Sequence, residues 1–224
     1  NESVNGITEG CNTFGIPVVS GNVSLYNSTE RGPIFPTPII GAVGKINNVK
    51  NIITSEFKNY NDLVILLGSS ALSKDHNDLA GSEYLEVIHK KIVGSPRIDL
   101  EFENQLQKCC LSLINNGLII SAHDCSEGGI AVTIAESCIL SNIGFESEIE
   151  INGRWDVSLF GEKHSQIIVS INPNEINSFS KICSDFDIPF ITLGITKPEI
   201  FKINSLILNT VSELKNAYST NFVK

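Results

Sequence analysis

The sequence predicts an α+β protein in which helices pack on a sheet, and three segments carry this prediction. An uninterrupted apolar run at 63–67 has the length of a buried strand. Apolar residues at 101–116 recur at the spacing of an amphipathic helix, and Gly117 stands where such a helix would be capped. Asn172, followed by Pro173, marks a helix start, because asparagine caps first turns and proline fits the first helical position.

Weaker signals place the other elements in chain order. Each is a short apolar run bounded by turn residues, or a run with apolar residues three or four apart. Helices are expected at 3–14, 129–140 and from 173 onward, and strands at 16–19, 39–43, 118–121, 165–171, 190–195 and 205–209. Residues 81–83 are interpreted as a loop or a helix cap, and the polar stretch up to about residue 36 as an exposed loop.

Length and composition bound the function. A chain of 224 residues, 42% of them hydrophobic and 18% charged, can bury a sizeable core, as one domain or as one domain plus part of another. The net charge of −9, without a cluster of Lys or Arg, argues against a nucleic-acid surface. No apolar run approaches the ~20 residues of a membrane span, and the first residues do not form a signal peptide, so a cytoplasmic protein is expected. The lack of methionine predicts a processed product or a piece of a longer chain.

Six cysteines are expected to be reduced, because no Cys-x-x-Cys pair of the kind found in zinc sites is present. Cys109, Cys110, Cys138 and Cys183 fall at apolar positions of the expected helices, where a free cysteine acts as a small hydrophobe. Cys125 lies at an expected helix start, which could lower its thiol pKa and favour the thiolate. A spacer role is the alternative, and it is favoured because no partner base is in view.

The densest group of polar residues and glycines is the turn from His123 to Gly129. A strand is expected to enter it and a helix to leave it, so unpaired N–H groups and a partial positive charge would face an anion such as phosphate. The residues proposed for this anion turn are Asp124, Ser126, Gly128 and Gly129. The alternative is a helix start capped by Ser126 or Asp124, with no ligand.

His123 and Asp124 suggest an acid–base pair, but adjacent side chains at a strand end point to opposite sides. They are therefore not expected to form a catalytic dyad. A packed or hydrogen-bonded role is favoured for His123 over proton transfer, and capping or ligand orientation for Asp124.

A second candidate site is the turn at Gly21, Asn22 and Ser24, which follows the expected strand at 16–19. The glycine permits unusual backbone angles, the asparagine amide oxygen is an acceptable Mg²⁺ ligand, and the serine hydroxyl can donate to a phosphate or carbonyl oxygen. A tight turn without any ligand uses the same residues, and that alternative stays open on the local pattern alone.

Five strings spread over the chain resemble the phosphoribosylformylglycinamidine synthase family: SGNVSLYN at 20–27, TPIIGAVG at 37–44, LAGSEYL at 79–85, SAHDCSEGG at 121–129 and SLFGE at 158–162. The first string is the specific one. The turn at 121–129 is shared by the wider superfamily, which includes aminoimidazole ribonucleotide (AIR) synthetase, thiamine-monophosphate kinase and selenophosphate synthetase.

The resemblance implies an AIR synthetase-like C-terminal domain, with helices on a mixed sheet, at 56–224. It implies that 1–55 is the tail of an ATP-binding domain. By the same resemblance Gly21 contacts ATP, Asn22 coordinates Mg²⁺ and Ser24 touches the substrate. The family supplies the partner carboxylates, a catalytic histidine and an ATP-binding lysine from the N-terminal half. No catalytic residue is therefore assigned in this chain, which is expected to be inactive by itself.

The reaction implied is an ATP-dependent ligation that converts formylglycinamide ribonucleotide and ammonia, released from glutamine, to the amidine in purine biosynthesis. The implied partners are a glutaminase subunit, a small accessory subunit and the N-terminal half. At 161–165 the chain departs from the family, because Lys163 and His164 replace a small polar pair, and the role of this loop stays open. The alternatives are a sibling enzyme, such as AIR synthetase or a small-molecule kinase, and a non-catalytic nucleotide-holding domain.

Overall fold

The computed structural model describes residues 2–24, 27–35, 37–46 and 48–220. Its contacts divide the chain into two compact units, Asn1–Val49 and Lys50–Lys224. The predicted domain boundary at 55/56 stays a prediction. No described helix is both long enough and apolar enough to cross a membrane.

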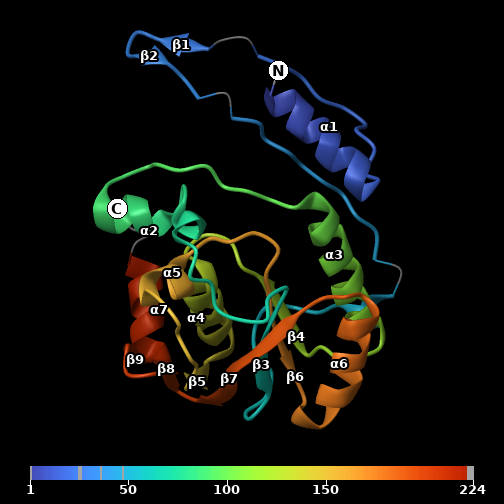
Figure 1. Ribbon diagram of the computed structural model, residues 1–224, viewed down its shortest axis with the longest axis vertical. Coiled ribbons are helices and arrows are strands. Elements are labelled where there is room, and N and C mark those ends of the chain that lie inside the picture. The colour runs from blue at the N-terminus through green and yellow to red at the C-terminus, as the bar shows by residue number, and fades with distance from the viewer. Residues whose placement is uncertain (1, 25–26, 36, 47, 221–224) are drawn as a thin grey trace. The chain divides into compact units, whose positions relative to one another are not determined.

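The first unit holds one helix, α1 (Glu2–Phe14), and one antiparallel hairpin of β1 (Ser28–Thr29) and β2 (Gly32–Pro33), as Figure 1 shows. The helix confirms the prediction for 3–14. The strands predicted at 16–19 and 39–43 are wrong, since both segments have no regular structure. A strand requires a neighbour to bond with, and in the described part of this unit only β1 and β2 pair.

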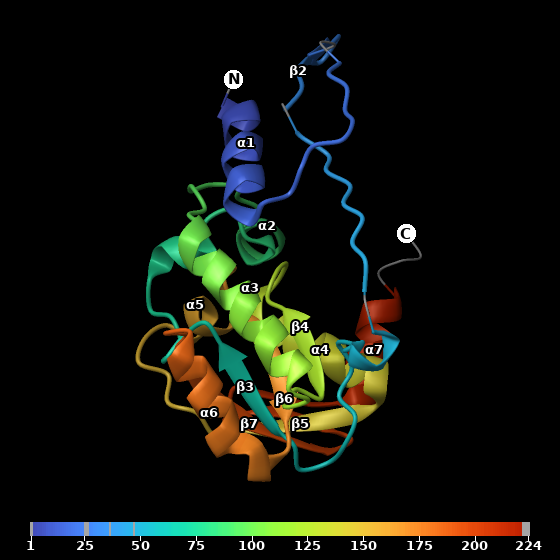
Figure 2. The same ribbon diagram turned by 90° about the vertical axis from the view of Figure 1, so that its right-hand side faces the viewer.

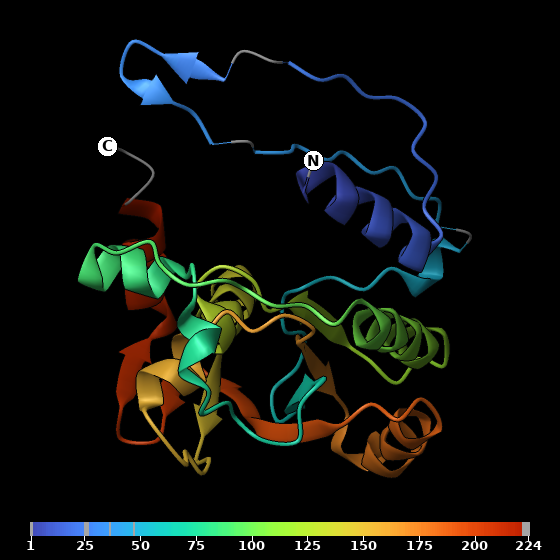
Figure 3. The same ribbon diagram turned by 45° about the horizontal axis from the view of Figure 1, so that its top comes forward.

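The second unit is a seven-stranded mixed sheet with helices on both faces (Figures 1 and 3). The strand order is β4-β6-β3-β7-β5-β8-β9, and every pair is antiparallel except β5 with β8, which is parallel. The strands are β3 (Leu63–Leu67), β4 (Ser121–Asp124), β5 (Ile143–Ser147), β6 (Ile167–Ile171), β7 (Phe190–Pro198), β8 (Ile200–Ile203) and β9 (Ile207–Thr210).

The α-helices of this unit are α2 (Glu83–His89), α3 (Leu100–Asn115), α4 (Gly129–Ser141), α5 (Trp155–Phe160), α6 (Ile176–Asp185) and α7 (Val211–Thr220). Short 3-10 turns lie at Val49–Asn51, His76–Leu79 and Pro173–Glu175. This architecture confirms the predicted α+β class, with helices packed on a mixed sheet.

The central strand β3 explains the uninterrupted apolar run. Val64 and Leu66 belong to one core, with α4, whereas Ile65 and Leu67 belong to a second core, with α3 and α6. All four side chains are fully buried, because helices cover both faces of the sheet at this strand. Figure 2 shows α3 and α6 beside β3 and β6, with α4 and α7 on the other side.

The predicted helices at 101–116 and 129–140 are confirmed as α3 and α4, and Asn172 caps the turn before α6 through a bond from the Asn174 N–H. The strands predicted at 165–171, 190–195 and 205–209 overlap β6, β7 and β9. Sequence reasoning missed β5, β8, α5, α7 and the short β1–β2 hairpin, which lies in the stretch predicted as an exposed loop. Of the two interpretations of residues 81–83, the helix cap is confirmed, because the Ser82 side chain accepts from the Leu85 N–H at the start of α2.

One predicted strand is misplaced. The run at 118–121 was expected to enter the polar turn as a strand, but β4 begins at Ser121, where pairing with Ser170 starts. Leu118 instead closes the end of α3, donating its N–H to the carbonyl of Leu113, and is buried in the α3–α6 core together with Ile119. The apolar run reflects this packing and not a strand ladder.

A substitution at Gly144 tests how closely the parallel strands β5 and β8 pack. A Cβ at this position would lie 2.1 Å from the carbonyl oxygen of Ile200. We expect Gly144→Ala to lower the free energy of unfolding by about 2 kcal/mol, because β5 and β8 would have to separate. Urea titration followed by circular dichroism measures this change. The control is Thr192→Ala, at an exposed position on β7, which should change stability by less than about 0.5 kcal/mol. Equal stability of both variants would contradict the packing described.

Candidate functional site

The turn between β4 and α4 is a helix start without a side-chain cap. Gly128 occupies the N-cap position with a φ of 79°, and no side chain caps it. The predicted caps, Ser126 and Asp124, are therefore wrong: both side chains are exposed, and Ser126 contributes its backbone carbonyl, which accepts from the Gly129 N–H at 3.1 Å. The strand-turn-helix context of the prediction is confirmed.

A residue distant in sequence, Glu162, caps the start of α4. The Oε1 atom of Glu162 accepts a hydrogen bond from the Gly128 N–H at 2.8 Å, and the same oxygen accepts from the Glu83 N–H at 2.8 Å. Glu83 is the first residue of α2, so one carboxylate joins the starts of two helices. A carboxylate is favourable there because helix starts present unpaired N–H groups and a partial positive charge.

Both glycines of the turn are explained by close packing. A Cβ on Gly129 would lie 2.5 Å from the carbonyl oxygen of Gly161, and a Cβ on Gly128 would lie 2.5 Å from a methyl carbon of Val132. The φ values of both residues are also positive, which disfavours other side chains. The glycine pair therefore lets the segment that ends at Glu162 lie directly on the start of α4.

His123 lies between two carboxylates. Its Nε2 atom is 3.1 Å from Glu136, on α4, and its Nδ1 atom is 3.5 Å from Asp124. The two side chains come closer than the prediction of opposite directions implies, although both residues belong to β4. The His123 side chain is only 17% exposed, as expected for a packed residue with polar partners. Sequence reasoning missed Glu136, since it belongs to another element.

Cys125 is a spacer and not an activated thiol. Burial raises its pKa to about 12; the charge of Asp124 also raises it, and hydrogen bonding from Thr133 opposes the shift. The predicted lowering of the thiol pKa at a helix start is therefore wrong, because the thiol packs against the α4 core and loses contact with water there.

Gln166 is a polar residue that the sequence did not signal. It is 4% exposed, and its Nε2 atom has no hydrogen-bond partner among the described residues. Its backbone carbonyl accepts from the Cys125 N–H at 3.0 Å. The side chain of Gln166 therefore lies on the same face of the sheet as that of Cys125, beside the turn.

The other candidate turn lies in the first unit. Gly21, Asn22 and Ser24 are exposed and have no regular secondary structure, and a Cβ on Gly21 would meet no atom within 4 Å. Leu25 and Tyr26, which belong to the same string, lie outside the described residues. The open backbone at Gly21 leaves room for a ligand, and the roles of these residues stay predictions.

The described side chains give little support for a metal-binding site. In the described part of the chain, no three His, Cys, Asp or Glu side chains gather in a group that could hold a metal ion. Asn22 offers a single neutral oxygen, whereas Mg²⁺ takes several oxygen ligands, including carboxylates or phosphates. The described residues therefore do not form a magnesium site by themselves.

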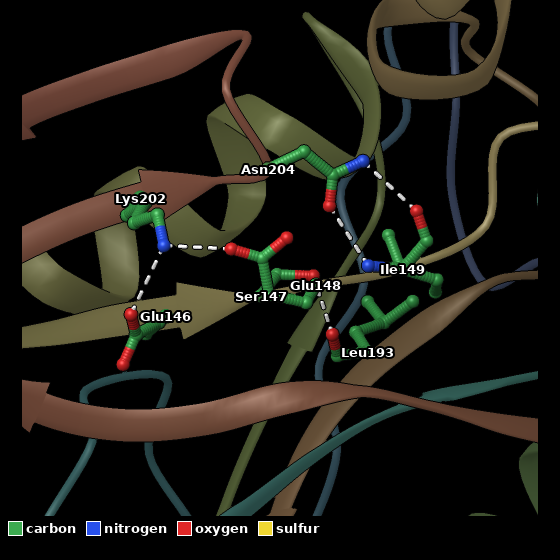
Figure 4. A network of polar contacts seen from close by, with 7 residues as sticks. All are labelled: Glu146, Ser147, Glu148, Ile149, Leu193, Lys202 and Asn204. Atoms are coloured by element: carbon green, nitrogen blue, oxygen red, sulfur yellow. Dashed lines mark hydrogen bonds and ion pairs between the residues drawn. The ribbon is translucent and has the colours of Figure 1, made fainter.

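An open groove of about 760 Å³ lies at another edge of the sheet, lined by Glu148, Ile149, Lys202, Asn204, Ser205 and Leu208. Figure 4 shows the polar contacts of four of these residues, Glu148, Ile149, Lys202 and Asn204. Lys202 contacts Glu148 at 2.6 Å and Glu146 at 3.3 Å, and these hydrogen bonds raise its pKa. Asn204 accepts from the Ile149 N–H at 2.8 Å and donates to the Ile149 carbonyl at 2.9 Å. Because two carboxylates neutralise the lysine, this groove does not attract a phosphate.

Comparison with protein families matches residues 60–199 to the AIR synthase related protein, C-terminal domain. The chain is 41% identical, over 196 residues, to phosphoribosylformylglycinamidine synthase subunit PurL of Caldanaerobacter subterraneus subsp. tengcongensis, covering 87% of this chain and 26% of that protein. It is 38% identical over 228 residues to the PurL subunit of Thermomicrobium roseum, covering 100% of this chain and 30% of that protein. The chain thus spans about a quarter to a third of the length of these curated relatives.

Solved structures share the fold. PurL of Thermotoga maritima in complex with AMPPCP has a TM-score of 0.69 and 16% identity, covering 95% of this chain and 35% of that one. The complex of the same protein with FGAR has a TM-score of 0.61 and 17% identity, covering 75% of this chain and 30% of that one. The AIR synthetase-like fold expected from the resemblance is therefore confirmed.

The desolvated thiol of the half-buried Cys125 has a measurable consequence. A pKa of about 12 keeps it protonated at pH 8, so iodoacetamide should label Cys125 at least about tenfold more slowly in the folded chain than in urea. Since the folded pKa lies above the unfolded value near 9, the stability contributed by the neutral thiol is complete below pH 9 and is lost as the pH rises toward 12. Peptide mass spectrometry reads the labelling, with the half-buried Cys11 as internal reference. Rapid labelling of Cys125 in the folded chain would contradict this environment.

Proposed function

The chain belongs to the AIR synthase related protein family, with its C-terminal domain at 60–199, and on this premise we propose that it is part of a phosphoribosylformylglycinamidine synthase. In the proposed reaction ATP phosphorylates the formamide oxygen of formylglycinamide ribonucleotide, and ammonia then displaces the phosphate to give the amidine. The observation that carries the proposal is the 38% identity to a PurL subunit across the entire chain, which includes the specific string at 20–27.

The ligands proposed for this chain are ATP, Mg²⁺ and formylglycinamide ribonucleotide. The related Thermotoga maritima protein has been solved with AMPPCP and with FGAR, which supports a nucleotide and this substrate for the family. We assign Gly21 to the nucleotide, Asn22 to the metal and Ser24 to the substrate. The exposure of all three residues is compatible with these roles.

These residues would contribute binding and orientation. A glycine backbone that meets no neighbouring side chain lets a nucleotide approach closely, and a serine hydroxyl can donate to an oxygen of the substrate. Holding two phosphate compounds together lowers the barrier by fixing their orientation. The metal would neutralise phosphate charge when bound, and its carboxylate ligands must come from elsewhere in the protein.

The turn at Asp124, Ser126, Gly128 and Gly129 is proposed, with less support, as a second anion-facing site. The Gly128 N–H already donates to Glu162, so in this arrangement an anion would have to use the exposed Ser126 hydroxyl, while the exposed Asp124 carboxylate would repel it unless a cation lay between them. Lys163 and His164 are also exposed, and a substrate-facing role for this loop stays a proposal.

The rest of the proposal concerns the assembly. Because the chain spans only 26–30% of its curated relatives, we propose that it works with an N-terminal half, a glutaminase subunit and a small accessory subunit in the cytoplasm. By itself the 224-residue chain should not catalyse the reaction.

Asn22→Ala tests the metal assignment. In a chain extended with the N-terminal half of a relative, this substitution should raise the Mg²⁺ concentration needed for half-maximal ATP-dependent turnover by about tenfold, because one oxygen ligand is lost. The control is Asn5→Ala on the exposed face of α1. Turnover with an unchanged Mg²⁺ dependence in Asn22→Ala would refute the role of Asn22.

A second candidate function is a non-catalytic domain that holds a nucleotide for stability. The observation that bears on it is that the Gly128 N–H already donates to the Glu162 carboxylate, so in this arrangement that donor is not available to a reacting phosphate. A catalytic half-site should bind ATP weakly, with a dissociation constant of about 1 mM or more. We therefore expect 1 mM ATP to raise the melting temperature of the chain by less than about 2 °C. Thermal shift measures this. A nucleotide that co-purifies and gives a larger shift would favour the non-catalytic function.

A further inference from the structure

The connection between β3 and α3, residues 68–99, buries only Gly68, Leu79 and Ser82. Apart from one 3-10 turn, α2 is its only regular element, and α2 has no buried residue. Four of its apolar side chains, Val87, Ile88, Ile92 and Val93, are more than half exposed. A segment with few buried apolar contacts opens at low free-energy cost, so specific contacts must hold it in place.

Those contacts converge on one short segment, residues 158–162. The Ser158 hydroxyl donates to the carbonyl of Ser73 at 2.6 Å, and the Glu162 N–H donates to the carbonyl of Asp78 at 2.7 Å. The ring of Phe160 stacks on that of Tyr84, with centroids 5.4 Å apart. The connection is therefore fastened to the end of α5 and to Glu162.

Glu162 also links this connection to α4. Its Oε1 atom accepts from the first N–H of α2, at Glu83, and from the N-cap N–H of α4, at Gly128. Both are bonds between a charged acceptor and a backbone donor, which are stronger than bonds between neutral groups. If the carboxylate were removed, both donors would lose this partner together.

Electrostatic repulsion between carboxylates opposes the two hydrogen bonds of Glu162. Partial desolvation raises the pKa of Glu83, and the charges of Glu86, Glu127 and Glu162 raise it further. Four carboxylates therefore gather around the two helix starts, and like charges in proximity repel each other. The closed arrangement depends on the two hydrogen bonds of Glu162 being stronger than this repulsion.

We propose that Glu162 is a latch that holds the 79–98 part of the connection against the start of α4, and that loss of its two hydrogen bonds lets this part open while the sheet stays folded. Loss of the second of these bonds frees the Gly128 N–H. If the anion turn of the proposed function is correct, the same latch governs when this donor is available to a phosphate; this consequence alone rests on the proposed function.

Hydrogen exchange of the 224-residue chain without any ligand tests the latch, so its outcome does not depend on the proposed function. In Glu162→Ala, amides in peptides covering 79–98 should exchange at least about tenfold faster, while those of β3 and α3 stay within about twofold of the wild type. Addition of sodium formate should slow the exchange again, because formate can accept the two freed N–H bonds.

The matched control is Glu127→Ala, which removes an exposed carboxylate of the same cluster. It should leave exchange in 79–98 unchanged or slower, because it reduces repulsion and leaves the latch intact. If Glu162→Ala does not fold, Glu162→Gln replaces it, and its acceleration should be smaller but confined to the same peptides. Exchange equal to wild type in the Glu162 variant, or acceleration of similar size in all peptides, would overturn the proposal.

Discussion

The burial of β3 on both faces is the constraint on which the second unit depends. Its side chains alternate between two cores, so α4 on one face and α3 with α6 on the other are both held by a single strand. A strand in this position must be apolar at every residue, since neither face can offer water to a polar group. The mixed sheet, and with it the position of the β4–α4 turn, follows from this two-sided burial.

The β4–α4 turn shows how a sequence pattern typical of phosphate binding can be satisfied within the protein. Paired glycines and a helix start do attract an anion, but the anion at Gly128 is the carboxylate of Glu162. The same glycines allow the chain around Gly161 to pack within van der Waals distance of α4. The turn therefore both lets a neighbouring backbone pack closely and binds an anion, and in this protein the backbone is that of Gly161 and the anion is the carboxylate of Glu162.

The two candidate sites differ in what surrounds them. The turn at 123–129 is built into the sheet, and its polar groups have partners in α4 and in the loop that ends at Glu162. The turn at Gly21 is exposed and lacks regular structure, although apolar residues flank it. The chain spans about a quarter of the length of a curated PurL relative, and the part of the family protein that would face the Gly21 turn is a matter of the proposed function.

The sequence by itself determined the α+β class, the helices α3 and α4, the central strand and the family, because apolar periodicity and short specific strings are local properties. It could not assign β5 and β8, whose pairing requires Gly144 to lie against the backbone of Ile200. Nor could it identify the partners of the turn: Glu136 for His123, and Glu162 for Gly128, are distant in sequence. Only the tertiary structure decided that the helix start was already capped and that Cys125 packs against the α4 core, because hydrogen bonds and packing depend on which distant segments fold together.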